Sequence, residues 1–273
     1  MTFSIVARSP DGESWGVAVA SKFLAVGSAV PAAVAGIGAL ATQADAHVGF
    51  KGEGLAMLAD GATAQVALDR LLGDDPGREH RQVGVVDVEG AAATHTGSGC
   101  LPWAGGVAAQ DVAIQGNVLA GPEVVEAMRA SWDATADEPV LARRLLSALR
   151  AGDEAGGDRR GRQSAALLVV RDGAGYGGHD DLAVDLRVDD HEAPVAELTR
   201  LLALNDLYLT ASTEEEKVAV DADLAAELDR RARDLGQPDF ASWVGSENYE
   251  MRVDAATPPT WVDRRVLAVI RGS

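Results

Sequence analysis

Segments with the character of β-strands occur mostly in neighbouring pairs along the first two-thirds of the chain, and this pairing restricts the fold most. Side chains alternate between two faces in residues 3–7 and 182–188, as in strands with one buried face, whereas segments such as residues 164–171 are continuously apolar. Segments with a helical repeat separate the pairs, which predicts an α+β fold of stacked antiparallel sheets with helices outside. The expected strands are residues 3–7, 15–20, 28–34, 38–42, 82–88, 91–95, 107–115, 164–171 and 182–188. The expected helices are residues 54–72, one from 122, 138–150 and 194–208.

The first strand begins directly behind Thr2, which suggests a chemical role for this residue. Thr2 is small enough that removal of Met1 would leave it as the first residue of the mature chain. Its hydroxyl would then lie beside its own α-amine, whose pKa is about 8, so part of the amine is an unprotonated base at neutral pH. A nucleophile activated by its own terminal amine is an established arrangement. The alternative is a threonine that merely starts the strand.

Charge and cysteine content exclude several classes of protein. The formal net charge is −18, which disfavours nucleic acid and anionic membranes as partners. A single cysteine, Cys100, rules out an internal disulfide, and no secretory signal is visible, so we expect a cytoplasmic protein. The longest apolar run, residues 29–44, is interrupted by proline and glycine and is too short to cross a membrane. The only lysines are Lys22, Lys51 and Lys217.

A change in character near residue 210 predicts two domains, residues 1–209 and 210–273. The second begins with a highly charged segment, residues 213–236, that we expect to be one helix capped by Ser212 or Thr213. A proline-rich linker then leads to a last short helix over residues 262–271. We therefore expect a small, mainly helical C-terminal module.

Six segments of the first domain contain motifs of a known family: residues 1–7, 16–22, 38–44, 115–119, 162–167 and 185–191. Together they resemble a family of uncharacterised bacterial and archaeal proteins similar to N-terminal nucleophile (Ntn) hydrolases of the proteasome type. The resemblance implies a four-layer αββα sandwich and an N-terminal threonine nucleophile. The tail, through Phe240, Trp243, Gly245, Glu247, Asn248 and Glu250, resembles a small module that has been proposed to bind peptidoglycan.

Three residues are candidates for catalysis. Thr2 would be the nucleophile, with its freed amine as base. Lys22, at the end of the second strand, would lower the pKa of the Thr2 hydroxyl or stabilise an oxyanion; the alternative is a solvated lysine in a turn. Gln43 lies where proteasome-type enzymes place oxyanion donors, or has only a structural role. The lysine that those enzymes carry on the third strand is missing from residues 30–35.

Four further residues are candidates for substrate binding. Ser21 would hydrogen-bond the amine or cap a turn. Asn117 would donate to an oxyanion or, as we favour, cap the helix that begins at Pro122. Arg162 with Ser164 would recognise a carboxylate, since arginine forms bidentate pairs; the alternative for Arg162 is an ordinary loop residue.

These features predict an Ntn-type amidohydrolase that cleaves a small amide without a cofactor and that forms a homo-oligomer. A non-catalytic binding protein on the same scaffold is the first alternative. A metal-dependent hydrolase using the Asp- and His-rich residues 179–191 is the second. A reactive pair of Cys100 and His95, with Asp45 or His47, is the weakest.

Overall fold

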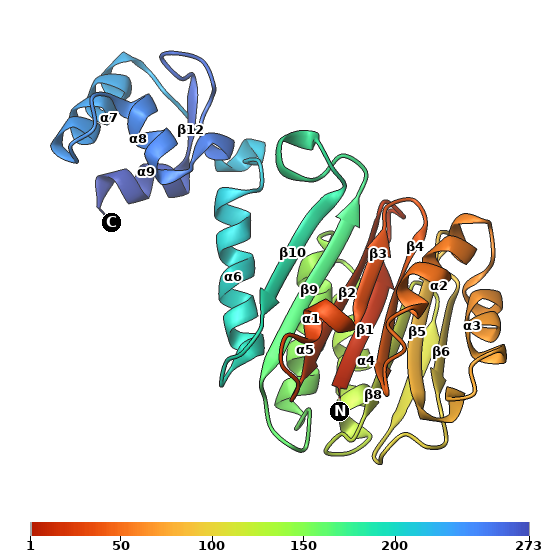
Figure 1. Cartoon of the computed structure of the whole chain (residues 1–273). Helices are drawn as coiled ribbons and strands as arrows, with labels where there is room; N and C mark the ends of the chain where they lie inside the picture. Colours follow the sequence, from red (N-terminus) through yellow and green to blue (C-terminus); the bar gives the residue numbers. More distant parts are fainter. Residues whose placement is uncertain (1, 273) are drawn as a thin grey trace. The chain divides into compact units, whose positions relative to one another are not determined.

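The predicted strand pairs form two antiparallel sheets in the computed structural model, which describes residues 2–272 (Figure 1). The six-stranded sheet has the order β10-β9-β2-β1-β8-β7, and the four-stranded sheet has the order β3-β4-β5-β6. Every neighbouring pair is antiparallel, so the mixed α and β fold with antiparallel sheets is confirmed. The strands are β1 (Thr2–Arg8), β2 (Ser14–Ser21), β3 (Pro31–Val34), β4 (Gly38–Ala44), β5 (Arg81–Asp87), β6 (Ala92–Thr96), β7 (Gly105–Ala109), β8 (Val112–Asn117), β9 (Ser164–Arg171) and β10 (Leu182–Val188).

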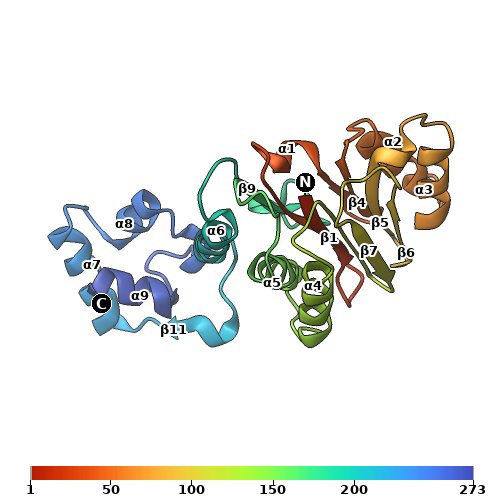
Figure 2. The ribbon, with the colours of Figure 1, turned by 90° about the horizontal axis from the view of Figure 1, so that it is seen from below.

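The two sheets pack against each other and each carries helices on its other face. Helices α4 (Glu123–Ala134) and α5 (Leu141–Glu154) lie side by side, and α5 packs on β1 and β2 (Figures 1 and 2). Helices α2 (Phe50–Ala59) and α3 (Ala64–Gly73) pack on β4 and β5 of the smaller sheet. A short helix, α1 (Val26–Ala29), connects β2 to β3. Valines and alanines from both sheets form the core between them.

The two-residue repeat of β1 decides which side chains enter this core. Val6 belongs to the core between the sheets, and Ser4 reaches Gln43 of the smaller sheet. Phe3 points to the opposite face, where it lies close to Gly152 of α5. Because side chains in a strand alternate, Thr2 is on the same face as Ser4 and Val6. Thr2 therefore faces the layer between the sheets.

Two elements predicted for the first domain are wrong in the same way, because a turn divides each predicted segment into two elements. The helix expected over residues 54–72 is two helices, separated at Gly61, whose φ of +84° favours glycine, and restarted by Thr63, which caps Val66 N–H. The strand expected over residues 107–115 is a hairpin of β7 and β8 that turns at Asp111.

The chain divides into two compact units, residues 1–200 and 201–273. This boundary falls inside α6 (Pro194–Tyr208) rather than after it. None of the helices within residues 2–272 has the length and apolar character needed to span a membrane.

The second unit has its own core and a different element order from the one expected. The single helix predicted over residues 213–236 is wrong: β11 (Lys217–Ala219) precedes α7 (Ala222–Asp234), which Asp221 caps. The last helix is preceded by β12 (Trp261–Asp263), which pairs with β11. Helices α7, α8 (Phe240–Glu247) and α9 (Arg264–Arg271) surround a core that includes Phe240, Trp243 and Tyr249.

Candidate functional site

Thr2 lies at the head of β1, between the ends of β2 and β8. In register it is opposite Ser21 on one side and Asn117 on the other. Its Oγ1 is 3.1 Å from the Oγ of Ser21, and only 6% of Thr2 is exposed. Two hydroxyls thus converge at the end of the central strand pair, in a setting shielded from bulk water. Met1 lies outside the described residues.

Below Thr2, a network of amide and hydroxyl side chains replaces the apolar core between the sheets. Gln82 Oε1 accepts hydrogen bonds from Gln43 Nε2 and Asn117 Nδ2, each at 2.9 Å. Ser4 donates to Gln43 Oε1 and accepts from Gln115 Nε2, both at 2.7 Å. These side chains are almost fully buried, and such groups are stable in a protein interior only when they are hydrogen-bonded. The network connects the two sheets at the end that carries Thr2.

The network uses the side chains of Gln43 and Asn117 to hold the main chain of Thr2. Gln43 Nε2 lies 3.4 Å and Asn117 Nδ2 lies 3.5 Å from the Thr2 carbonyl oxygen. Both amides also bind Gln82, so each fits a positioning role better than that of an oxyanion donor. The favoured prediction that Asn117 caps a helix is wrong: Asn117 is the last residue of β8, and α4 has Pro122 at its N-cap without a side-chain cap.

Lys22 follows Ser21, but its amine contacts a loop carbonyl rather than the Thr2 hydroxyl. Its Nζ donates to the carbonyl oxygen of Arg162 at 3.3 Å, and the residue is exposed. Asp158, which is buried, accepts the Lys22 backbone N–H at 2.7 Å, and Arg160 donates to the Lys22 carbonyl at 3.0 Å. Within residues 2–272 no hydrogen bond joins Lys22 to Thr2. The lysine therefore belongs to a loop that Asp158 organises.

Ser164 and Arg162 support neighbouring segments. Ser164 Oγ donates to the Phe23 carbonyl and accepts the Val26 N–H at 3.1 Å, so it fixes the loop after β2. Arg162 Nε donates to Asp153 at 2.7 Å, and this hydrogen bond raises the pKa of Arg162. A small pocket beside Ser21 is lined by both residues and by Asp158. The structure thus brings Arg162 and Ser164 to the Thr2 end of the sheet, with their polar groups already engaged.

The Asp- and His-rich residues 179–191 do not converge. Asp180 and Asp181 accept backbone N–H groups within their own loop, and Asp185 pairs with Arg187 at 2.9 Å. Among residues 2–272 no group of three or more His, Cys, Asp or Glu side chains is arranged to hold a metal ion.

The proposed pair of Cys100 and His95 also has separate partners. Cys100 Sγ contacts the Arg81 carbonyl at 3.4 Å, and burial raises the pKa of its thiol. His95 Nε2 lies 3.1 Å from the Arg78 carbonyl. A raised thiol pKa disfavours the nucleophilic thiolate.

Sequence reasoning missed three residues that organise this site: Gln82, Gln115 and Asp158. A sequence signal existed for the glutamines, since Gln82 and Gln115 lie at the ends of expected apolar strands, where an uncharged polar side chain can be buried with a partner. Asp158 lies in an Asp- and Arg-rich loop that resembles ordinary surface, so its burial depends on the tertiary fold.

Comparisons with known proteins place the chain in a family whose function is unknown. A crystal structure of protein SPO2555 from Silicibacter pomeroyi matches with a TM-score of 0.67 and 32% identity, covering 75% of this chain and 89% of that chain. Its description assigns it to the same family as this chain. A search of curated proteins gave no match. Residues 2–198 match the model of the family of unknown function DUF1028, and the chain therefore belongs to the DUF1028 family.

Proposed function

We propose that this protein is an Ntn-type amidohydrolase in which Thr2, freed by removal of Met1, cleaves a small amide bond. The observation that carries the proposal is the placement of Thr2 at the head of the central strand β1, with its hydroxyl 3.1 Å from Ser21 and its carbonyl held by the buried amide network. Two antiparallel sheets packed between helices, with a threonine opening a central strand, also fit the αββα resemblance.

The reaction requires no group beyond Thr2, water and backbone donors. The α-amine removes the hydroxyl proton as Oγ1 bonds to the substrate carbonyl carbon. The tetrahedral intermediate collapses, the C–N bond breaks, and the leaving amine takes that proton. Water, deprotonated by the same α-amine, then attacks the ester, releases the carboxylic acid and restores Thr2. We assign the oxyanion to backbone N–H groups near Gln43, because its side-chain amide is already used.

The test begins with intact mass analysis of the purified protein, which should show the loss of Met1. A β-lactone probe that acylates N-terminal threonine should then add one probe mass. The probe should label the wild type and Thr2→Ser but not Thr2→Val, which keeps the branched shape of threonine and replaces its hydroxyl by a methyl group. Amide hydrolysis should fall at least 100-fold in Thr2→Val. Retention of Met1, or full labelling of Thr2→Val, would overturn the proposal.

A non-catalytic binding protein on this scaffold is the second candidate, and the lysines favour it. Lys22 Nζ contacts the Arg162 carbonyl, Lys51 Nζ contacts the Ser28 carbonyl at 3.0 Å, and Lys217 pairs with Glu214. No lysine therefore assists Thr2 in the described part of the chain, and the α-amine must act alone. Retained Met1 together with saturable binding of an amide that is never cleaved would favour this candidate. The predicted homo-oligomer is checked by light scattering on the same preparation.

A further inference from the structure

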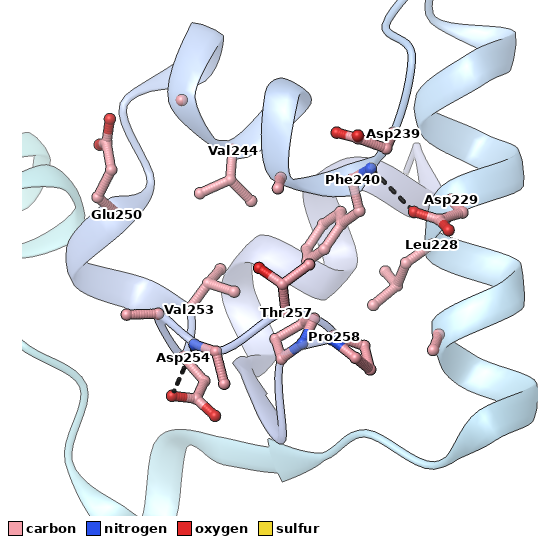
Figure 3. Close-up of a pocket in the computed structure, with 16 residues that line it drawn as sticks. Leu228, Asp229, Asp239, Phe240, Val244, Glu250, Val253, Asp254, Thr257 and Pro258 are labelled. Atoms are coloured by element: carbon pink, nitrogen blue, oxygen red, sulfur yellow. Dashed lines mark hydrogen bonds between the residues drawn. The ribbon is translucent and has the colours of Figure 1, made fainter.

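The second unit contains a pocket of about 480 Å³ that no part of the proposed hydrolase mechanism uses (Figure 3). Helix α7 forms one wall, α8 a second, and residues 253–259 a third. All of its lining residues lie between residues 225 and 259, so the pocket belongs to this unit alone. Its volume is in the range of pockets that bind small organic molecules.

The interior of the pocket is apolar. Leu228 of α7, Phe240 and Val244 of α8, and Val253 line it, and Pro258 and Pro259 close the loop side. Figure 3 shows Phe240, Val244 and Val253 around the centre, with Thr257 and Pro258 below them. Such a surface would contact an aromatic or aliphatic body, and burying that body would favour binding.

Every charged residue in the lining is acidic. Asp229 and Asp239 lie on the α7–α8 side, and Glu250 and Asp254 lie across the pocket from them (Figure 3). None of the four forms an ion pair within 4.0 Å among residues 2–272. The four carboxylates thus give the pocket a negative charge that no direct ion pair neutralises, although Arg233 lies near enough to Asp239 to help lower the pKa of that carboxyl.

Local hydrogen bonds keep at least two of these groups ionised. The Ser242 backbone N–H donates to Asp239 at 2.8 Å and lowers the pKa of Asp239. Hydrogen bonds from Thr260 lower the pKa of Asp254. Glu250 is exposed, and within residues 2–272 no hydrogen bond or ion pair engages its carboxylate, so this carboxylate remains available to a ligand.

We infer that this pocket binds an organic cation: an apolar body that fills the space between Phe240, Val244 and Val253 and carries an amine or guanidinium group for the surrounding carboxylates. The charge of the four carboxylates favours the cation, while an anion of the same shape would be repelled. The cation is either a free small amine or a lysine or arginine side chain beside an apolar residue in a peptide. The inference does not depend on Thr2 chemistry.

The test uses ligands that share one body and differ in charge. Titration calorimetry of the full chain would compare 4-phenylbutylamine, 4-phenylbutanol and 4-phenylbutyrate. The amine should bind at least fivefold more tightly than the alcohol, and the acid should not bind. Added salt should weaken the binding of the amine but not that of the alcohol. Blocked Lys-Phe-Lys tripeptide forms a second arm. Tighter binding of the tripeptide identifies a polypeptide source, and tighter binding of the amine identifies a small metabolite.

Two substitutions test whether the amine binds in this pocket. A Cβ added at Gly245 meets no atom within 4 Å, so Gly245→Leu should fold normally and abolish binding by filling the pocket. Its matched control is Ser246→Leu on the neighbouring position, which does not line the pocket. Glu250→Gln should weaken the binding of the amine about threefold and leave the binding of the alcohol unchanged. Glu247→Gln, at a position outside the pocket lining, should change the binding of neither ligand. Equal binding of all three probes, binding of none, or full binding by Gly245→Leu would overturn the inference.

Discussion

At the scale of single residues, the interior of the first unit is unusual because amides and hydroxyls occupy one end of an otherwise apolar layer. Gln82 is the centre of this network. Its Oε1 accepts from Gln43 and Asn117, and its Nε2 donates to the Gly116 carbonyl at 2.7 Å. Since both partners of Gln82 also contact the Thr2 carbonyl, the stability of the layer and the position of Thr2 depend on the same side chain.

Replacing Gln82 tests this dependence. Gln82→Leu leaves the amide donors of Gln43 and Asn117 without their acceptor in a buried site, so we expect a loss of about 2–4 kcal/mol in the free energy of unfolding. Urea denaturation measures it. Gln65→Leu, on the exposed face of α3, is the matched control and should change stability by less than about 0.5 kcal/mol. A change in Gln82→Leu as small as that of the control would contradict the role assigned to Gln82.

At the scale of elements, the segment that leaves β2 is held by a loop more than a hundred residues later in the chain. The Asp158 carboxylate accepts the backbone N–H groups of Lys22 at 2.7 Å and Arg160 at 2.9 Å. Ser164 holds the next residues through Phe23 and Val26. Residues 22–26 therefore have an ordered path beside Ser21 because buried polar groups fix their backbone.

Removal of the Asp158 carboxylate should loosen this segment selectively. In Asp158→Ala, hydrogen exchange at the Lys22 amide should accelerate at least tenfold, because its acceptor is lost, while exchange in α3 should stay unchanged. Asp180→Ala removes a turn carboxylate from the loop between β9 and β10 and serves as the control, with Lys22 still protected. Unchanged exchange at Lys22 in Asp158→Ala would show that other contacts hold the segment.

At the scale of the whole molecule, the second unit depends on a buried ion pair as well as on its apolar core. Arg252 Nη1 lies 3.0 Å from Asp263 Oδ2, and both side chains are almost completely buried. Burial raises the pKa of Asp263, but hydrogen bonds from Arg265 and Ser212 outweigh it, so the pKa lies below its ordinary value of 3.8. Because the folded state favours the ionised Asp263 carboxylate, this group stabilises the fold above about pH 4. That contribution to the free energy of unfolding is lost as the pH falls through the lowered pKa.

The lowered pKa of Asp263 predicts how the stability of the second unit depends on pH. The wild type should lose stability on acidification below about pH 4, measured by the fluorescence of Trp243 and Trp261 in urea titrations. Asp263→Asn leaves Arg252 buried with Glu216 as its remaining acidic partner, and should cost roughly 3 kcal/mol at pH 7. The variant should also show a smaller loss between pH 5 and pH 3. A loss on acidification as large as that of the wild type would exclude Asp263 as its source.

Local patterns in the sequence were sufficient for many elements of the fold. Strand β10 and helix α6 match their predicted bounds, because alternation and helical repeat reflect burial on one side. Strand β9 also matches its predicted bounds, because a short continuous apolar run is typical of a strand that is buried on both faces. Prediction failed at Asp111, where the turn lacks a strong sequence signal, and at Gly61, where the apolar residues on both sides fit one helical face despite the turn dipeptide Asp60-Gly61. It also failed where an acidic segment resembled one long helix but contains β11 and α7.

The sequence was enough to place Thr2 directly before a strand and Ser21 directly after the neighbouring strand, since both follow from the opening hairpin. The groups that surround Thr2 depend on the tertiary structure. It directed the Lys22 amine to the Arg162 carbonyl and engaged the Gln43 amide, and it buried Gln82 between two sheets. The physical reason is that periodicity encodes which face of a strand is buried, whereas the partner of a buried polar group is fixed by the packing of strands far apart in the chain.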